Sequence, residues 1–92
     1  MNYEVKHLPE QSRFELDLDG KAAYADYHLS GNVMTIFHVY TPIEFRGKGI
    51  AGAVAKYALD YIREHNLKIV PQCPYMRDYM NKHPEYRDLL SK

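Results

Sequence analysis

The chain has 92 residues, and its 12 basic and 12 acidic side chains give a formal net charge of zero. This balance argues against nucleic acid as the main partner, because proteins that bind phosphate backbones usually carry an excess of positive charge. A chain of this length forms one domain with a modest core, expected here over residues 1–92, as a monomer or a weak dimer. No apolar run approaches the ~20 residues that span a bilayer, so we expect no membrane partner.

Cys73 is the only cysteine, which excludes an intramolecular disulfide and is typical of a reducing compartment. The first residues, Met1 to Lys6, lack the apolar core of a signal peptide. We therefore expect a cytoplasmic protein. The histidines other than His38 show no metal-ligand spacing with cysteine or carboxylate, so we also expect no metal.

The first forty residues are expected to form an antiparallel β-meander. Alternation of apolar and polar residues, with many β-branched and aromatic side chains, predicts four strands, over residues 3–8, 13–18, 21–29 and 33–41. Within the second strand, Phe14, Leu16 and Leu18 fall on one face, which is the pattern of a half-buried strand. The pair Asp19-Gly20 is a strong hairpin signal between the second and third strands.

The pattern becomes helical after Pro42. From Gly47 to about His65, apolar residues recur at the spacing of one helix face, at Ile50, Ala51, Val54, Ala55, Ala58, Leu59 and Ile62. A short strand over residues 67–70 and a second helix over residues 74–82 follow. The last residues, 85–92, are expected to form an irregular turn packed by Tyr86, Leu89 and Leu90.

A strand, a crossover helix and a return strand are parallel and right-handed in almost all proteins. The segment from Val33 to Val70 has this order of elements. The sheet is therefore expected to be antiparallel at its start and parallel at its last pair, which defines an α/β fold with a mixed sheet.

The glycine-rich loop before the long helix is the most informative segment. Its N–H groups and the helix dipole favour an anion, and glycine at 47 and 49 lets a diphosphate approach the backbone. Each N–H bond to a charged oxygen is worth ~1.5–3 kcal/mol and the dipole ~0.3–1 kcal/mol, so loop shape should dominate, with Arg46 and Lys48 adding charge. On spacing alone, an equally good alternative is that the glycines only make a tight turn and let the helix pack closely on the sheet.

The run Arg46-Gly47-Lys48-Gly49-Ile50-Ala51 resembles the R/Q-x-x-G-x-G/A pyrophosphate loop of the GNAT superfamily of acetyl-CoA-dependent N-acetyltransferases. The chain is most similar to a branch of minimal GNAT-like proteins with a His-Thr-x-Val strand end and a Pro-x-Cys-x-Tyr segment after the return strand. Here these segments are His38-Val39-Tyr40-Thr41 and Pro71-Gln72-Cys73-Pro74-Tyr75. The chain departs at Val39 and Thr41, where the branch usually has Thr and Val, so contacts there are expected from the backbone.

The resemblance implies acetyl-CoA as co-substrate and an amine, in a small molecule or a protein, as acceptor. The pantetheine arm would lie between the strand before the loop and the return strand, with the pyrophosphate at the loop and the thioester near Cys73. The implied cofactor-binding residues are Val39, Tyr40, Thr41, Arg46, Gly47, Lys48, Gly49, Ile50, Ala51, Pro74 and Tyr75.

Three side chains are catalytic candidates: Cys73, His38 and Tyr79. Cys73 either takes the acetyl group from CoA and passes it to the amine, or lines the gap while the amine attacks the thioester directly. A structural alternative for Cys73 is a small buried apolar residue, which is the usual role of a free cysteine.

His38 alternates with Ile36 and Tyr40 along its strand, so the three are expected to share a face, and it could act as general base for the amine. Tyr79 lies one helical turn beyond Tyr75 and could protonate the departing CoA thiolate. A surface histidine and a packing tyrosine are the structural alternatives. The resemblance thus implies an acetyl-CoA-dependent N-acetyltransferase, with a CoA-binding module without turnover and a protein-interaction domain as competing functions.

Overall fold

The computed structural model describes residues 4–91. One sheet has the strand order β1-β2-β3-β4-β5, and its strands are β1 (Val5–Leu8), β2 (Arg13–Asp17), β3 (Ala22–Ser30), β4 (Val33–Tyr40) and β5 (Lys68–Pro71). The first four strands pair antiparallel, and β4 pairs parallel with β5. The mixed sheet is therefore confirmed, while Tyr3 and Lys92 of the predicted elements lie outside the described residues.

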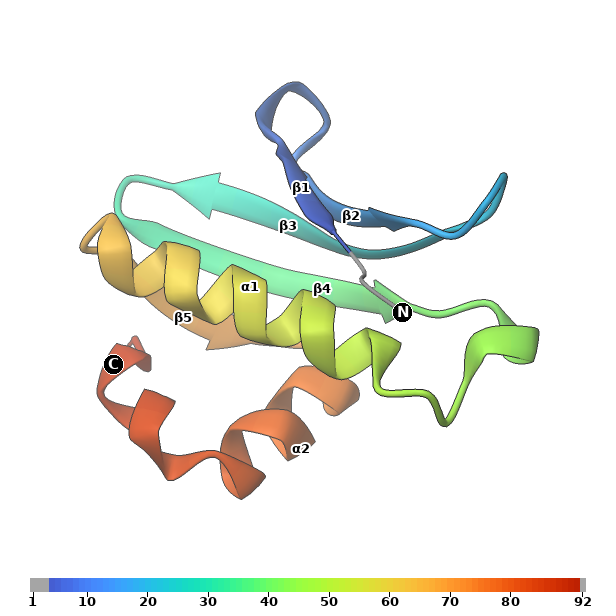
Figure 1. Cartoon of the computed structure of the whole chain (residues 1–92). Helices are drawn as coiled ribbons and strands as arrows, with labels where there is room; N and C mark the ends of the chain where they lie inside the picture. Colours follow the sequence, from blue (N-terminus) through green and yellow to red (C-terminus); the bar gives the residue numbers. More distant parts are fainter. Residues whose placement is uncertain (1–3, 92) are drawn as a thin grey trace.

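Two helices and three 3-10 turns complete the fold, namely α1 (Ile50–Glu64), α2 (Pro74–Lys82), η1 (Pro9–Gln11), η2 (Ile43–Phe45) and η3 (Pro84–Leu89). The crossover between β4 and β5 is α1, which lies across one face of the sheet (Figure 1). It begins at Ile50 and not at Gly47, because the backbone at Gly47 and Gly49 is left-handed, with φ of 80° and 76°. The bounds of α2 agree with the prediction.

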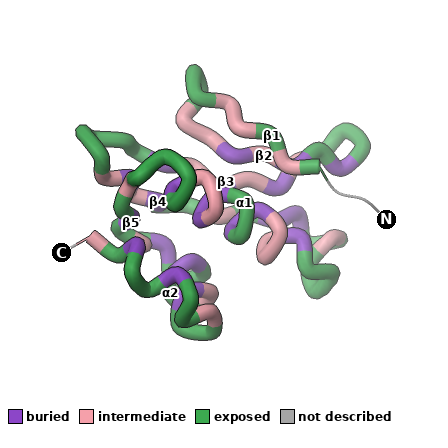
Figure 2. The backbone as a smooth tube through the Cα atoms, turned by 60° about the vertical axis from the view of Figure 1, so that its left-hand side comes forward, coloured by how far each residue is buried: buried purple, intermediate pink, exposed green. Residues whose placement is uncertain are grey.

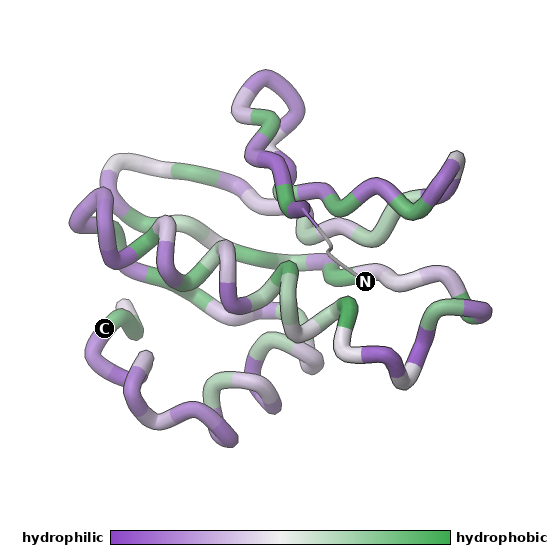
Figure 3. Tube along the Cα trace, in the orientation of Figure 1, coloured by the Kyte–Doolittle hydropathy of each residue, from purple (hydrophilic) through white to green (hydrophobic). Residues whose placement is uncertain are grey.

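The core lies between the sheet and the helices. Phe14, Leu16 and Leu18 are buried, as their alternation predicts. In α1 the buried residues are Ile50, Val54, Ala55, Ala58, Leu59 and Ile62, all members of the predicted stripe. Figure 2 shows the buried segments where helices and strands face each other, and Figure 3 shows hydrophobic and hydrophilic positions alternating along α1.

The hairpin between β2 and β3 has the predicted turn. Asp19 and Gly20 have positive φ values of 56° and 94°, as a type I′ turn requires. Leu18 and Lys21 close the turn with N–H to carbonyl bonds in both directions, at 2.6 and 3.4 Å. The local chemistry of two residues thus sets the register of the first hairpin.

The C-terminal segment differs from its prediction at one residue. Tyr86 and Leu89 of η3 are buried, as expected, but the Leu90 side chain is 38% exposed. Leu90 forms a parallel bridge with Ile69 of β5, and the Ser91 N–H donates to the Ile69 carbonyl at 2.9 Å. The backbone of Leu90, and not its side chain, therefore attaches this segment, because it extends along the outer edge of β5.

The pairing of β4 with β5 stops halfway along β4. Val33 to Ile36 pair with Lys68 to Pro71. The Ile36 carbonyl then accepts the N–H groups of both Gln72 and Cys73, each at 3.1 Å. From residue 37 to 40, β4 continues past the end of β5 and pairs only with β3 (Figure 1). The two strands therefore part at Ile36.

A β-bulge lies at the same place on the other side of β4. Residues 36 and 38 of β4 lie opposite consecutive residues of β3, which leaves Phe37 without a partner. Ile36 is fully buried on the side of α1, whereas His38 is exposed on the opposite face of the sheet. The prediction that Ile36 shares a face with His38 and Tyr40 is wrong, because the bulge shifts the alternation by one residue. His38 and Tyr40 do share a face.

Candidate functional site

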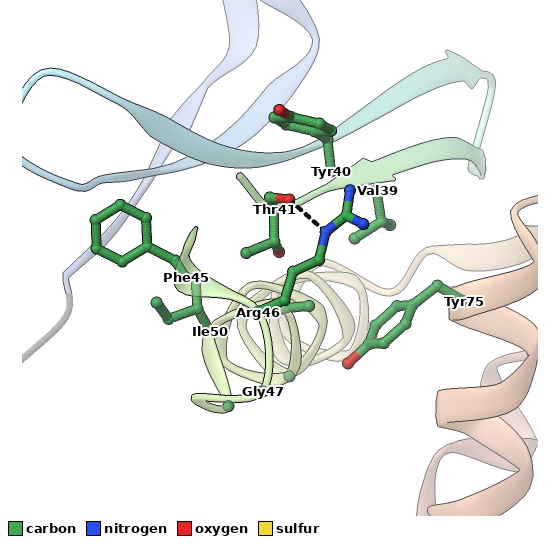
Figure 4. A pocket seen from close by; sticks show the side chains of 11 residues that line it. Val39, Tyr40, Thr41, Phe45, Arg46, Gly47, Ile50 and Tyr75 are labelled. Carbon is green, nitrogen blue, oxygen red and sulfur yellow. Dashed lines mark hydrogen bonds between the residues drawn. The ribbon is translucent and has the colours of Figure 1, made fainter. Parts of the chain in front are cut away.

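A pocket of 420 Å³ lies at the point where β4 runs past β5, within the size range of small-molecule sites. The end of β4, the loop after it, the first turn of α1 and the start of α2 contribute its lining (Figure 4). The lining residues are Val39, Tyr40, Thr41, Phe45, Arg46, Gly47, Gly49, Ile50, Ala51, Gly52 and Tyr75. Segments far apart in the sequence thus converge on one cavity.

The backbone of the loop, and not its packing, requires glycine. A Cβ atom built on Gly47 or Gly49 would meet no atom within 4 Å. Close packing of the helix on the sheet is therefore not the reason for these glycines, whereas their positive φ is. Gly49 caps α1 without a side-chain hydrogen bond to the first turn. The N–H groups of that turn are therefore left without a side-chain cap, as an anion site requires.

Arg46 is attached to the end of β4. Its Nε donates to the Thr41 carbonyl at 3.0 Å, and the guanidinium lies on the same side of the pocket as Val39 and Tyr40 (Figure 4). Its terminal nitrogens make no hydrogen bond to any residue in the range 4–91. Lys48 does not line the pocket, and its Nζ lies 5.7 Å from the centroid of the Phe45 ring. The loop therefore presents one arginine to the pocket.

Thr41 lines the pocket with a buried side chain, 8% exposed. Its Oγ1 finds no hydrogen-bond partner among the described residues. An unsatisfied buried hydroxyl costs ~1–3 kcal/mol. The end of β4 is therefore not optimised for stability of the chain alone.

Tyr75 lines the pocket from the first turn of α2, and its hydroxyl lies next to Gly52 of α1. A Cβ built on Gly52 would stand 3.8 Å from the Tyr75 hydroxyl and 3.7 Å from Tyr79 Cε2, which is ordinary contact. Burial raises the pKa of both tyrosines, so both phenols are protonated at neutral pH. Tyr79 stacks on His83 with ring centroids 4.1 Å apart and does not line the pocket.

Cys73 is the N-cap residue of α2 and belongs to the core, with 8% exposure. Its N–H bonds to the Ile36 carbonyl, so its backbone lies where the strands part. Neither Cys73 nor Pro74, which occupies the first position of α2, lines the pocket. His38 also lies outside it, on the open face of the sheet, where its ring stacks near Tyr40 at 6.4 Å.

The structure thus brings together nine of the eleven predicted cofactor-binding residues in one pocket, and leaves Lys48, Pro74 and the three catalytic candidates outside its lining. Sequence reasoning missed Phe45 and Gly52. Gly52 carried a signal, because an isolated glycine inside a helical pattern often marks a packing or functional position. Phe45 carried none beyond its place next to the loop.

The described residues give two further findings. None of the helices between residues 4 and 91 has the length and apolar character to cross a membrane. Over the same residues, no cluster of three or more His, Cys, Asp or Glu side chains is arranged to hold a metal ion. The expectation of no metal in the protein stays a prediction.

Comparison with known proteins agrees with this geometry. A family profile described as GCN5-related N-acetyl-transferase matches residues 13–89. The chain belongs to this family, and the resemblance to minimal GNAT proteins is confirmed. The fold and the family support acetyl transfer in general and imply acetyl-CoA and an acceptor as the molecules involved.

Individual proteins to which the chain is similar point to the same family. The chain is 30% identical over 83 residues to Protein NATD1 of Mus musculus, covering 87% of this chain and 76% of that protein. It is equally similar to Protein NATD1 of Homo sapiens, of which it covers 74%. The NMR solution structure of a GCN5-like putative N-acetyltransferase from Staphylococcus aureus superposes with a TM-score of 0.71 and 25% identity, covering 96% of this chain and 87% of that one.

Proposed function

We propose that this chain, in the cytoplasm, transfers the acetyl group of acetyl-CoA to a primary amine at the point where β4 and β5 part. One observation carries the proposal: the β4–β5 ladder ends at Ile36, and the pocket occupies the space beyond it. The unpaired edge of β4 offers backbone groups to the pantetheine amides, and the glycine loop offers N–H groups to the diphosphate. Val39, Phe45 and Ile50 supply the apolar part of the lining.

The reaction is direct attack on the thioester. The amine nitrogen forms a bond to the carbonyl carbon, the C–S bond breaks, and the CoA thiolate leaves. The proton that the amine loses passes through solvent to His38, which lies outside the pocket lining, and a tyrosine returns a proton to the thiolate sulfur. We assign this acid to Tyr75 and not to Tyr79, because Tyr75 lines the pocket and Tyr79 does not. Direct attack is preferred to a covalent step because Cys73 is buried in the core.

The binding step is tested by thermal unfolding with acetyl-CoA, with Gly49→Val and a matched control, Gly31→Val. Both glycines have left-handed backbones, with φ of 76° and 59°, and open space at the Cβ position. Each substitution should therefore cost a similar ~1–2 kcal/mol of stability. Acetyl-CoA at 100 times its Kd should stabilise wild type and Gly31→Val by about 2.7 kcal/mol, and Gly49→Val far less.

The outcomes separate the competing functions. Equal stabilisation of both variants would contradict the loop as the binding site, and no stabilisation of wild type would favour the protein-interaction alternative. Binding without release of free CoA on addition of amines would favour a non-catalytic binding module. Mass spectrometry after incubation with acetyl-CoA tests the mechanism, because direct attack predicts an unmodified Cys73 and an unchanged rate for Cys73→Ala.

A further inference from the structure

Gly52 is a helical glycine that the backbone of α1 does not require. It lies in the first turn of the helix, after the Gly49 cap. Gly47 and Gly49 have left-handed backbones, whereas the φ of Gly52 lies outside that region, so any residue can adopt its conformation. Glycine inside a helix is destabilising relative to alanine, because it loses more backbone freedom on folding. The conformation of α1 therefore gives no reason for a glycine at this position.

The packing of α1 against α2 gives no reason either. A Cβ atom built on Gly52 would stand 3.7 Å from Tyr79 Cε2 and 3.8 Å from the Tyr75 hydroxyl, which are ordinary van der Waals distances. Apart from the helix itself, no other atom of residues 4–91 comes within 4 Å of that position. A methyl group would therefore fit in the free chain, where it would add contacts with two tyrosines.

The bare backbone of Gly52 faces the pocket. Gly52 lines the cavity together with the glycine loop and Tyr75, and Figure 4 shows the Tyr75 side chain reaching from α2 toward the first turn of α1. The Ala53 N–H donates to the Gly49 carbonyl at 3.1 Å and opens the hydrogen-bond ladder of α1. The Gly52 N–H precedes this ladder and has no partner within the helix. The feature that Gly52 adds to the molecule is thus open space in the pocket, next to unpaired backbone.

We propose that Gly52 is a specificity-determining residue for the acyl donor, because the arm of CoA lies directly on its bare backbone. The inference rests on the proposed function, which puts the diphosphate at the glycine loop and the thiol near Tyr75. Gly52 lies next to both, so the arm that joins these two groups crosses it. A Cβ at residue 52 would hold the arm away from the helix by about the length of a carbon–carbon bond. The glycine therefore weakens the free helix and serves the bound state.

Gly52→Ala separates stability from binding. The free variant should unfold at a higher urea concentration than wild type, with an unchanged slope, because alanine is the better helix former. Its Kd for CoA, measured by calorimetry, should rise about 10-fold, which corresponds to about 1.4 kcal/mol and is typical of an overpacked contact. Glu64→Ala, at the exposed C-terminal end of α1, is the control and should leave the Kd unchanged.

Two results of this experiment would overturn the proposal. An unchanged Kd for CoA in Gly52→Ala would show that no part of the ligand needs the space at residue 52. A lower urea midpoint in the free variant would show that the fold itself requires the glycine, and the measured Kd would then not report on the arm.

Fragments of CoA identify the part of the cofactor that lies on Gly52. Phosphopantetheine carries the arm and one phosphate, whereas adenosine 3′,5′-bisphosphate carries the nucleotide and lacks the arm. Gly52→Ala should weaken phosphopantetheine by the same factor as CoA and leave adenosine 3′,5′-bisphosphate unchanged. Gly49→Val should weaken both fragments, because both place a phosphate at the loop. Equal losses for the two fragments in Gly52→Ala would overturn the assignment of the arm to this residue.

A double-variant cycle tests whether Gly52 and Tyr75 bound the same part of the cavity. Tyr75→Ala removes the ring next to residue 52 and lets the arm shift away from an added Cβ. Gly52→Ala should therefore raise the Kd for CoA much less in the Tyr75→Ala background than in wild type. The same fold-change in both backgrounds would contradict a shared contact with the arm.

Failure of this inference can be told apart from failure of the proposed function. If Gly52→Ala weakens CoA binding in a chain that releases no CoA from acetyl-CoA on addition of amines, the inference is supported and acetyl transfer is rejected. If wild type and Gly52→Ala turn over acetyl-CoA with the same KM, acetyl transfer is supported and the inference is rejected. Absence of CoA binding by wild type would reject both.

Discussion

The two halves of β4 lie in opposite environments. Residues 33–36 pair on both sides, with β3 and β5, and Met34 and Ile36 are fully buried. Residues 37–40 pair only with β3, and most of their side chains are exposed. One strand therefore serves packing in its first half, and in its second half it places Val39 and Tyr40 in the lining of the pocket. The comparison shows that a pocket can be made by ending a partner strand early, without adding an element to the fold.

The largest expected effect is a difference in the free energy of unfolding between substitutions in the two halves of β4. Ile36→Ala removes a fully buried side chain and should cost ~2–5 kcal/mol, because it leaves a cavity in the core. Phe37→Ala, one residue further, removes a side chain that is 48% exposed and should cost less than about 1 kcal/mol. Urea denaturation of both variants measures the difference. Equal costs would show that the boundary between the halves does not lie at Ile36.

The next effect concerns acetyl-CoA binding next to the second half of β4. Arg46→Gln removes the guanidinium from the pocket and breaks its bond to the Thr41 carbonyl. A hydrogen bond to a charged group is worth ~1.5–3 kcal/mol, so the Kd for acetyl-CoA should rise roughly 10- to 100-fold. Lys48→Gln is the matched control, since Lys48 lies outside the pocket lining, and calorimetry should show a much smaller change. A larger loss in Lys48→Gln would reverse the assignment.

A smaller effect, of opposite sign, is expected at Thr41. Thr41→Val replaces an unsatisfied buried hydroxyl with a methyl group of similar volume. The free protein should be stabilised by up to about 1 kcal/mol, measured as a higher urea midpoint at constant slope. Destabilisation by Thr41→Val would mean that the hydroxyl has a partner, and the residue directly after β4 would then be better satisfied than we infer.

The smallest effect concerns the pH dependence of stability, which we assign to His7 and not to the region where β4 and β5 part. His7 of β1 shares a 2.6 Å hydrogen bond with the Tyr27 hydroxyl, and its ring stacks on Phe14. Burial, and then the charge of His65, lower the pKa of His7 below 6.5 in the folded chain. The unfolded chain therefore binds a proton at His7 more readily than the folded chain does. The stability that neutral His7 contributes is present above pH 6.5 and is lost as the pH falls below it.

His7→Gln tests this pH dependence. The free energy of unfolding, followed by urea denaturation between pH 7.5 and 5, should fall less in the variant than in wild type. The Kd for acetyl-CoA should follow the same pH profile in both proteins, because His7 lies away from the pocket lining. A variant with an undiminished acid loss would place the responsible group elsewhere.

Local chemistry explains what the sequence predicts well. The Asp19-Gly20 turn and the start of α2 at Pro74 depend on two or three neighbouring residues, so both are readable without the fold. The stripe of α1 and the alternation of β2 predict the core because burial follows periodicity. The glycine loop is recognisable from its place before the long helix and from its resemblance to a pyrophosphate loop, and the structure adds that Gly47 and Gly49 have positive φ.

The bulge at Phe37 could not be predicted. Alternation passes through residues 36–40 without a glycine, a proline or a change in composition, and the shift arises from the register between β3 and β4. The stacking of His38 on Tyr40 and the Arg46–Thr41 bond depend on that register or on the path of the loop, so they become visible only in three dimensions. Sequence reasoning therefore predicted most of the residues that line the pocket, and it was wrong about the face of the sheet on which His38 lies.

The double hydrogen bond at the Ile36 carbonyl has a consequence for selectivity among acyl donors. Two N–H groups hold this oxygen, and Pro71, its opposite residue on β5, has no N–H with which to extend the ladder. The two hydrogen bonds and the missing N–H of Pro71 therefore fix the residue at which the two strands part. We expect propionyl and butyryl thioesters to react progressively more slowly than acetyl thioesters, because each added methylene has to fit at the closed end of the gap, where β4 and β5 part.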